Sequence, residues 1–549
     1  MVKDKILVLC MFFFTGCSII NKNHHAFSPP KPFLWENATV YFLLTDRFYN
    51  GDTGNDFKHS INPAPMRGYM GGDIRGITKK IEDGYFQKLG VNAIWMTPLV
   101  ENIYGSVDEG TGTSYAYHGY WTKDWSTVDR RLGTSEDVFK MVKSAHKRGI
   151  RVIMDVVINH TGPVTPLDTK WPDDWVRTGP NCTYQDYKTT TECTLVTNLP
   201  DIRTESLTEV NLPQHLIDKW KSEGRLVNEL AELDAFFKRT NYPRRPYFYI
   251  IKWLTDLIRE FGIDGFRVDT AKHADEEVWK ILHDESIIAY NDWKKLNPNE
   301  LPDFKDFYMV GEVYNYNAGN GRIFDFGDKK VDYFSFGFDA LINFEFKENA
   351  KNDYAELFTK YDVLLNGSLR GKTLLNYISS HDDGSPFDKS RKKSYESAIK
   401  LLLCQGGAQI YYGDESERSL HAKADGDATL RSFMNWDEQK IHEKALILGH
   451  WQKIGLFRHN HLSVGAGRHH QISVKPFVFA RTYESNSLSD KVVCAIDMPI
   501  GNKKISVTPY FNEGDKILDT YSQKIATVKN GIVEFDTPFD IVLLEYKNR

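Results

Sequence analysis

Four short segments of this chain end in side chains that can do chemistry. They are 155–160 (DVVINH), 265–273 (GFRVDTAKH), 311–314 (GEVY) and 378–383 (ISSHDD). Each follows or begins as an apolar run, a pattern typical of a barrel strand whose last residues point out of one end of the barrel. Asp269, Glu312 and Asp382 would then converge on one cleft, and converging carboxylates are what glycoside hydrolysis requires.

The elements that must position these residues can be read from periodicity. Eight apolar runs have the length of strands, at 39–47, 92–98, 151–159, 265–270, 307–313, 331–336, 373–379 and 408–412. Between them lie runs of helical period; in one, Thr134 and Asp137 have the spacing of a capping box and Gly149 marks the end. Alternating strands and helices predict an α/β fold, a TIM (β/α)8 barrel with buried parallel strands.

Two regions interrupt this alternation. Segment 161–245 is rich in Thr, Asp, Asn, Pro and Trp and is predicted to be an excursion domain after the third strand. From residue 456 to 549 short strands with turns predict a C-terminal antiparallel β-sandwich, with strands at 471–482, 491–497, 504–509, 532–535 and 541–546. The barrel itself would then comprise residues 33–160 and 246–455.

The composition is that of a soluble globular protein. The 549 residues exceed one compact core, and 41% are hydrophobic and 26% charged. A net charge of −5 without a basic run gives nucleic-acid binding little support. Aromatic residues reach 13%, which suits stacking on sugar rings but suits large cores and surface tyrosines equally well.

The N-terminus has the pattern of an export signal. Lys3 and Lys5 precede an apolar run at 6–14, which is too short to span a bilayer as a stable helix. The following Thr-Gly-Cys resembles a bacterial lipobox, although Phe14 replaces the usual aliphatic residue, and it predicts lipidation of Cys17 and a signal peptide at 1–17. The proline-containing segment 18–32 reads as a tether. The residue directly after the cysteine is Ser18, whereas lipoproteins retained at the inner membrane usually have Asp there. We therefore expect the protein to be located at the outer membrane surface or in the periplasm, with plain secretion as the alternative.

Four further cysteines lie within the expected fold. Cys182 and Cys193 flank a polar loop, and an exported protein can oxidise them to a disulfide. Cys404 and Cys494 lie in apolar runs and are expected to be buried free thiols. No CxxC or His/Cys cluster suggests zinc.

With these motifs in order, the chain resembles the α-amylase superfamily of retaining glycoside hydrolases from about Val40 to the C-terminus. Further segments agree with the family, namely 90–98 (GVNAIWMTP), 117–121 (YHGYW), 199–201 (LPD) and 407–415 (GAQIYYGDE). Taken singly, each motif has a structural explanation such as a salt bridge or a hydrogen-bonded histidine. Their joint order on successive strands favours the functional interpretation.

The resemblance implies a role for each carboxylate. Asp269 would be the nucleophile and Glu312 the acid/base, about 5–5.5 Å apart as retention requires. Asp382 would hold sugar hydroxyls and stabilise the transition state. Arg267 would keep Asp269 ionised, whereas neighbouring negative charge and partial desolvation should raise the pKa of Glu312.

Further substrate contacts follow from the same resemblance. Tyr120 would stack beneath the reacting sugar with His118 beside it, and Asp155 would orient Arg267. The implied substrate-binding residues are His118, Tyr120, His160, Arg267, Lys272, His273, His381, Asp427 and Arg431.

Calcium is the implied cofactor. Oxygen-bearing side chains on a tight loop suit this ion. The loop that begins at Asn50 has such side chains, and together with Gly71 and Asp73 it resembles the N-terminal calcium site of some amylases and cyclodextrin-forming relatives. The implied ligands are the side chains of Asn50, Asp52, Asn55, Asp56 and Asp73 and the carbonyl of Gly71; a polar turn without metal is the alternative. A second family site would use Asn159 and the carbonyl of His273. Where an acidic ligand is expected before Leu199, however, this chain has Thr194, Thr197 and Asn198.

The Lys272-His273 pair is typical of family members that cut α-1,4 bonds, and cyclodextrin-forming relatives usually carry extra modules after the β domain. We therefore expect endo-acting hydrolysis of α-1,4-glucosidic bonds in starch-like polysaccharide or maltooligosaccharide. Transglycosylation, debranching, or maltodextrin or cyclodextrin hydrolysis on the same site are alternatives. A non-catalytic glycan-binding lipoprotein is disfavoured, because all three carboxylates and Arg267 are present.

Overall fold

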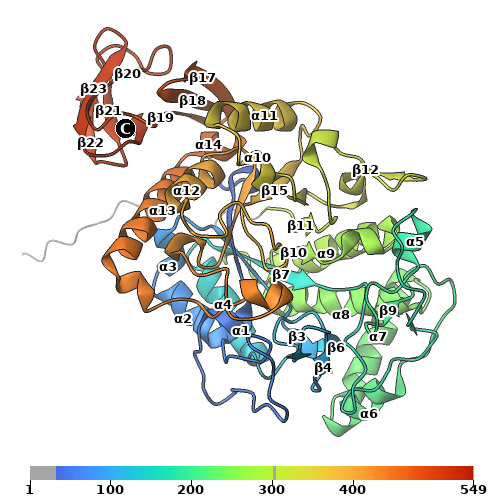
Figure 1. Ribbon diagram of the computed structural model, residues 1–549. Helices are drawn as coiled ribbons and strands as arrows, with labels where there is room; N and C mark the ends of the chain where they lie inside the picture. Colours follow the sequence, from blue (N-terminus) through green and yellow to red (C-terminus); the bar gives the residue numbers. More distant parts are fainter. Residues whose placement is uncertain (1–31, 301–304, 548–549) are drawn as a thin grey trace, which may run out of the picture. The chain divides into compact units, whose positions relative to one another are not determined.

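Eight parallel strands close into a barrel in the computed structural model of the chain (Figure 1). In barrel order they are β1 (Thr39–Leu43), β2 (Ala93–Met96), β7 (Arg151–Val156), β10 (Gly265–Val268), β11 (Tyr308–Gly311), β14 (Ala340–Asn343), β15 (Thr373–Tyr377) and β16 (Gly407–Tyr411), which pairs with β1. Neighbours in the barrel are thus neighbours in sequence. The TIM-barrel prediction is confirmed.

The structure describes residues 32–300 and 305–547. The predicted signal peptide, Cys17 and the predicted tether up to residue 31 lie outside this part of the chain. From Phe33 onward the chain forms one compact unit.

The sixth strand lies later than we predicted. Residues 331–336 form the end of a hairpin, β12 (Phe324–Asp325) with β13 (Lys330–Val331), followed by the 3-10 helix η4 (Tyr333–Phe336). Tyr333 and Phe334 are buried in the core, so their apolar pattern reflects packing and not strand pairing. The true sixth strand is β14.

Helices surround the barrel (Figure 1). The longer ones are α2 (Ile74–Glu82), α4 (Ser135–His146), α8 (Pro246–Phe261), α9 (Glu276–Leu296), α11 (Tyr354–Asn366), α12 (Ser394–Leu402) and α13 (His442–Asn460). Shorter ones are α1 (Thr45–Phe48), α3 (Tyr85–Lys88), α10 (Phe346–Asn349) and α14 (Leu462–Ala466). The capping box of Thr134 and Asp137 at the start of α4 is present, as predicted.

The segment after the third barrel strand has little sheet. It contains the short pair β8 (Val176–Arg177) and β9 (Asp201–Ile202), with helices α5 (Lys188–Thr191), α6 (Gln214–Ser222) and α7 (Leu226–Thr240). Trp175 and Trp220 pack against Trp253 of α8, with ring centroids 6.4 and 6.0 Å apart respectively. This aromatic contact anchors the segment to the barrel. Two further small pairs, β3 (Val100–Asn102) with β6 (Thr122–Val128) and β4 (Val107–Asp108) with β5 (Thr113–Ser114), lie between β2 and α4.

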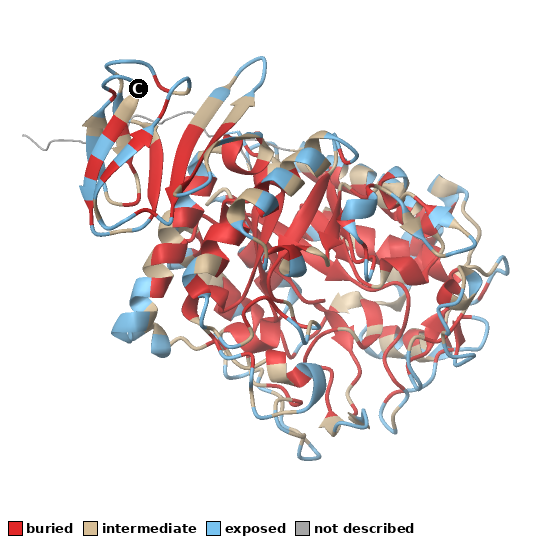
Figure 2. Ribbon diagram, turned by 45° about the horizontal axis from the view of Figure 1, so that its top comes forward, coloured by how far each residue is buried: buried red, intermediate tan, exposed pale blue. Residues whose placement is uncertain are grey.

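The C-terminal part is an antiparallel β domain, as predicted. A sheet of six strands has the order β17 (Arg468–Ser473), β18 (Phe477–Glu484), β19 (Ser489–Ile496), β24 (Val542–Tyr546), β21 (Lys516–Asp519) and β22 (Lys524–Thr527). A second sheet pairs β20 (Gly501–Ser506) with β23 (Ile532–Thr537), and residues of both sheets share one apolar core. Figure 2 shows buried residues in the barrel strands and in these sheets.

Sequence reasoning merged or missed strands in this domain. The run predicted as one strand at 471–482 is the hairpin of β17 and β18, and β21 and β22 were not predicted. Residue 456, where we placed the start of the domain, lies within α13, and the first strand begins at Arg468. In the part of the chain described here, no helix has both the length and the apolar character needed to cross a membrane.

Candidate active site

A cleft of about 840 Å³ lies over the carboxyl ends of the barrel strands. It brings together most of the predicted residues, and its lining includes His118, Tyr120, His160, Asp269, Lys272, His273, Glu312, Asp382, Asp427 and Arg431. Arg267 and His381 are predicted contacts outside this lining; both are nearly fully buried. The four sequence segments therefore do meet at one site.

One guanidinium group links the central carboxylates. Nη1 of Arg267 lies 2.8 Å from Oδ1 of Asp269, and Nη2 lies 2.9 Å from Oε1 of Glu312. Because the two carboxylates bind the two terminal nitrogens of one guanidinium group, they must lie close together. This arrangement is compatible with the separation of about 5–5.5 Å between the carboxyl groups of retaining enzymes.

The guanidinium is itself held from the neighbouring strand. Asp155 of β7 accepts a hydrogen bond from Nη1 of Arg267 at 3.0 Å. Its other oxygen, Oδ2, accepts from the Trp95 indole at 3.1 Å and from the Tyr120 hydroxyl at 2.8 Å. Asp155 is only 1% exposed, so these contacts fix the orientation of Arg267, as the family resemblance implied.

Glu312 has the environment of a proton donor. Its Oε2 accepts the backbone N–H of Thr270 at 3.0 Å, and Thr270 adopts a left-handed backbone with φ 48°. Burial raises the pKa of Glu312, the negative charges of Asp269 and Asp382 raise it further, and Arg267 opposes the shift. The carboxyl group therefore holds its proton at higher pH than an ordinary glutamate does.

Asp382 faces the cleft, with 41% of its side chain exposed. It forms an ion pair with Nη2 of Arg431, and Nε2 of His381 lies 3.1 Å from its Oδ2. Burial alone would raise the pKa of Asp382, but His381, Arg431 and Arg267 together lower it. Arg431 also donates to the His381 carbonyl at 3.0 Å, and its Nη2 lies 3.7 Å from Asp427.

His118, His160 and Tyr120 line the cleft, and His381 contacts Tyr120 from outside this lining. The Tyr120 ring centroid lies 5.4 Å from that of His381 and 5.7 Å from that of His118. His160 contacts the Tyr120 carbonyl through Nε2 at 3.1 Å. Burial lowers the pKa of all three histidines, so they are neutral rings near neutral pH, each with one N–H to donate.

The opposite part of the cleft is aromatic and cationic. The Lys272 ammonium lies 5.5 Å from the Tyr184 ring centroid and 5.1 Å from that of Tyr314. Both tyrosines line the cleft and are half-exposed. The sequence analysis assigned a functional role to neither tyrosine. Tyr314 could have been found because it follows Glu312 by two residues, whereas nothing in the sequence distinguishes Tyr184.

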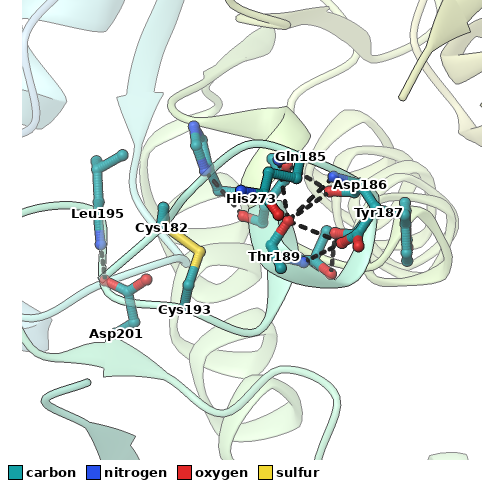
Figure 3. The surroundings of a disulfide bond; sticks show 11 residues. Cys182, Gln185, Asp186, Tyr187, Thr189, Cys193, Leu195, Asp201 and His273 are labelled. Carbon is teal, nitrogen blue, oxygen red and sulfur yellow. Dashed lines mark hydrogen bonds between the residues drawn. A yellow bond between two sulfur atoms is a disulfide. The ribbon is translucent and has the colours of Figure 1, made fainter. Parts of the chain in front are cut away.

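The predicted disulfide is present and closes the loop that carries Tyr184. Figure 3 shows Cys182 and Cys193 bonded beside His273, with Cα atoms 4.9 Å apart. Within this loop the Thr190 carbonyl contacts Nδ1 of His273 at 3.1 Å. The disulfide therefore closes a loop within the excursion, and the Thr190–His273 contact joins this loop to the residue next to Lys272. Cys404 and Cys494 are buried and free, as predicted.

The loop proposed to bind the first calcium fits a hard cation in part. The side-chain oxygens of Asn50 and Asn55 are buried and have no hydrogen-bond partner among the residues that the structure describes. Asp56 accepts from the Asn50 amide at 2.8 Å, and a Cβ at Gly71 would lie 2.6 Å from an oxygen of Asp56. Unpartnered oxygens around a glycine are a donor set that suits calcium.

Two other predicted ligands are already engaged. Asp73 caps α2 and accepts the N–H groups of Gly51, Asp52 and Gly76 at 3.0, 2.7 and 2.6 Å. Asp52 pairs with Arg75 at 2.5 Å. Within residues 32–300 and 305–547, no three His, Cys, Asp or Glu side chains cluster as a metal site would. A cation here would therefore depend on the Asp56 carboxylate and on amide and carbonyl oxygens.

The second predicted calcium site gains an acidic residue. Asp201, in the Leu-Pro-Asp motif, pairs with His160 through a β-bridge and faces Asn159. Burial raises the pKa of Asp201 to about 8, with Asn159 and Arg177 only partly opposing the shift. A buried carboxyl group whose charge is only partly compensated is a suitable calcium ligand. We had looked for this residue before Leu199, but it lies after it.

The fold is a (β/α)8 barrel, and one guanidinium group binds carboxylates at the carboxyl ends of its strands. Together these features define the class of this protein, which is a glycoside hydrolase. The chain belongs to the α-amylase family, because the family model "Alpha amylase, catalytic domain" matches residues 42–445. The periplasmic α-amylase of Escherichia coli (strain K12) is 35% identical over 508 residues, which cover 81% of this chain and 70% of that protein.

More distant relatives agree. A cyclomaltodextrin glucanotransferase from Bacillus sp. (strain 6.6.3) is 27% identical, and the match covers 72% of this chain and 51% of that protein. This chain therefore spans about half the length of that relative. The crystal structure of an Anoxybacillus α-amylase has the same fold, with a TM-score of 0.64 at 24% identity, covering 94% of this chain and 100% of that one.

Proposed function

We propose that this protein is an endo-acting hydrolase of α-1,4-glucosidic bonds in starch-like polysaccharide and that it retains the anomeric configuration. The observation that carries this proposal is the single Arg267 guanidinium between Asp269 and Glu312. The family supplies the substrate class, since the Escherichia coli relative is named a periplasmic α-amylase.

In the first half-reaction, Asp269 attacks C1 of the sugar and Glu312 gives its proton to the departing glycosidic oxygen. Arg267 donates a charge-assisted hydrogen bond to the attacking carboxylate. In the second half-reaction, Glu312 takes a proton from water, whose oxygen attacks C1 and releases Asp269. Asp382, oriented by Arg431, would hold sugar hydroxyls, and the stacked Tyr120 ring would support the sugar face.

The remaining predicted contacts form two groups in the lining of the same cleft. Arg431 contacts Asp382 and Asp427, whereas Lys272, next to His273, contacts Tyr184. We assign the first group to the donor part of the glucan and the second to the part that leaves. Tyr184 joins the leaving side as an additional aromatic contact.

We further propose two structural calcium ions. Asn50, Asn55, Asp56 and the Gly71 carbonyl would hold the first, while Asn159, Asp201 and the His273 carbonyl would hold the second. Bound calcium would neutralise buried oxygens and keep the loops at the cleft in place. Removing calcium with a chelator should lower the melting temperature, and adding it back should restore the original value. An unchanged melting temperature in chelator would contradict both sites.

For localisation we propose an exported lipoprotein, at the outer membrane surface or in the periplasm. The name of the Escherichia coli relative supports export. The lipid anchor rests on Cys17 in the sequence alone. Replacing Cys17 with serine should move the protein from the membrane fraction to the soluble fraction, and no change in fractionation would contradict the anchor.

A transferase or cyclodextrin-directed activity is the second candidate, because relatives named cyclomaltodextrin glucanotransferase and cyclomaltodextrinase match the chain. The products separate the candidates. Hydrolysis of maltoheptaose gives only shorter oligosaccharides, transfer gives longer ones as well, and debranching acts on pullulan.

The direct test uses soluble starch and the Asp269→Asn variant. Purified wild-type protein should release short oligosaccharides that are initially of α configuration. Asp269→Asn should lower the rate by several orders of magnitude, because the covalent intermediate cannot form. Asp437→Asn, at a fully exposed aspartate, is the matched control and should keep full activity. Substantial activity of Asp269→Asn would contradict the mechanism.

A further inference from the structure

A second hollow of about 340 Å³ meets the cleft at Glu312. Both hollows are lined by Glu312, Tyr314, Asn315 and Asp382. We call the second one the side channel; its other lining residues are Trp95, Arg267, Ile342, Phe344, Lys347, Tyr377, Ser380, Asp383, Gly384, Ser385 and Gln409. Gly384 and Ser385 are exposed, whereas Trp95 and Gln409 are buried inside the barrel. The side channel therefore leads from the surface to Glu312 by a route of its own.

The walls of the side channel carry polar atoms that require partners. Both amide atoms of Gln409 and Nε of Arg267 are buried without a hydrogen-bond partner in the described residues. Gln409 and Arg267 are each only 1% exposed. Buried polar groups are normally hydrogen-bonded, and a volume of this size is large enough for several water molecules. Water is therefore the fitting occupant.

A sugar suits the side channel less well than water. One face of the Trp95 ring is covered by Phe42, with centroids 3.7 Å apart, and the Arg267 guanidinium lies 5.1 Å from its centroid. Near the mouth, Lys347 forms an ion pair with Asp383, which also accepts from the Tyr377 hydroxyl at 2.9 Å. Phe42 and Arg267 thus occupy ring surface of Trp95 on which a pyranose could stack.

We propose that the side channel delivers the water that hydrolyses the glycosyl-enzyme. This inference rests on the proposed function. The water gives a proton to the Glu312 carboxylate as its oxygen bonds to C1. The bond from C1 to Asp269 breaks, and its electron pair returns to the Asp269 carboxylate. Because the water enters beside Glu312, the leaving chain can stay on Lys272 and the two tyrosines, and hydrolysis is favoured over transfer.

The first test needs only the wild-type protein. 4-Nitrophenyl α-maltotrioside serves as donor and maltose as acceptor, raised until transfer saturates. Hydrolysis should then level off at a rate above zero, because water still reaches Glu312 when the acceptor fills the cleft. A hydrolysis rate that falls to zero as transfer saturates would show that water enters through the cleft and would overturn the proposal.

The second test narrows the side channel. Ser385→Trp would plug its exposed mouth, Gln409→Leu would remove its inner polar anchor, and Ser385→Ala is the matched control. Both test variants should raise the ratio of transfer to hydrolysis several-fold at fixed maltose, while the first-turnover release of nitrophenol stays at the wild-type rate. The control should keep the wild-type ratio.

An unchanged ratio in folded Ser385→Trp would overturn the proposal. That position is exposed, so the result does not depend on a core substitution. If wild-type protein releases no nitrophenol even in the first turnover, the proposed function fails instead, and the two failures are distinct.

Discussion

At the scale of single residues, the site depends on one guanidinium group, that of Arg267, which several carboxylates share. Arg267 contacts Asp155, Asp269 and Glu312 at once. A shared guanidinium lets two carboxylates lie close together while their environments differ: Glu312 is buried against negative charge, which raises its pKa. This difference is what a nucleophile and a proton donor require.

Lys272 should influence the pKa of Glu312 and therefore the difference between the two carboxylates. It lines the cleft, and its positive charge interacts with Glu312. A nearby cation favours the ionised carboxylate, so Lys272→Met should raise the pKa of Glu312 further. The alkaline limb of the kcat/KM profile should then move to higher pH, by up to about one unit. Lys272→Arg keeps the charge and should leave the limb in place; a shift to lower pH in Lys272→Met would contradict this reasoning.

The sequence named the central carboxylates and the residues around Arg267 that the structure brings together, but it missed two residues that depend on tertiary structure. Asp269, Glu312 and Asp382 stand at strand ends, where position in the fold follows from local pattern. Tyr184 was missed, because it reaches Lys272 through a loop whose path depends on a disulfide and on tertiary contacts. Asp201 was missed because its burial, and not its neighbours in sequence, makes it a candidate ligand.

At the scale of elements, strand prediction succeeded where burial on both faces coincided with pairing. β7 and β10 are fully buried and paired along their length. The run at 331–336 has the same apolar character, but it packs as a 3-10 helix. Apolar content alone cannot separate a strand from a buried turn. Apolar content also fails in the opposite case: β21 and β22 have few apolar residues and escaped prediction, although they are strands.

The disulfide loop is the element whose removal should change specificity. Cys182 and Cys193 are 11 residues apart, and closing a loop of this size stabilises the fold by about 2–3 kcal/mol. The double variant Cys182→Ser/Cys193→Ser should therefore melt earlier. It should also raise KM for maltoheptaose, because Tyr184 loses its anchor, with little change in kcat.

The short donor 4-nitrophenyl α-maltotrioside provides the internal control for this prediction. Its glucan part occupies the donor side, away from Tyr184, so its KM should stay near the wild-type value. Equal increases in KM for both substrates would indicate a general loss of structure and contradict a specific role of the loop.

At the scale of the whole molecule, the C-terminal sheets are joined to the barrel helices by buried polar contacts. Arg481 of β18 donates to the carbonyls of Leu403 and Val464 at 3.1 and 3.0 Å. Arg458 of α13 holds the same segment from the barrel side, because it donates to the carbonyls of Leu402 and Cys404 at 3.0 and 2.8 Å. Cationic side chains that bind backbone carbonyls fix orientation, so we expect the barrel and the β domain to unfold together.

His461, which follows α13, should make this junction sensitive to pH. Its Nδ1 lies 2.9 Å from Asp490 of β19 and its Nε2 lies 2.6 Å from Glu545 of β24. Burial opposes protonation of His461, but the two carboxylates outweigh burial and raise its pKa. A raised pKa stabilises the fold below the unfolded value of about 6.5, and this contribution is lost as pH rises through the folded value. His461 also lowers the pKa of Asp490, so the aspartate adds stability above its unfolded value of about 3.9 that disappears in acid.

The stabilising window of the junction therefore lies between about pH 4 and pH 6.5. His461→Gln should lower the free energy of unfolding by about 1–3 kcal/mol within this window, and the difference from wild type should shrink as pH rises above it. Chemical denaturation across this pH range measures the difference. His442→Gln, at the exposed first residue of α13, serves as the control. A difference that grows with rising pH would show that His461 is neutral in the folded protein and that its contacts with the two carboxylates do not hold the junction.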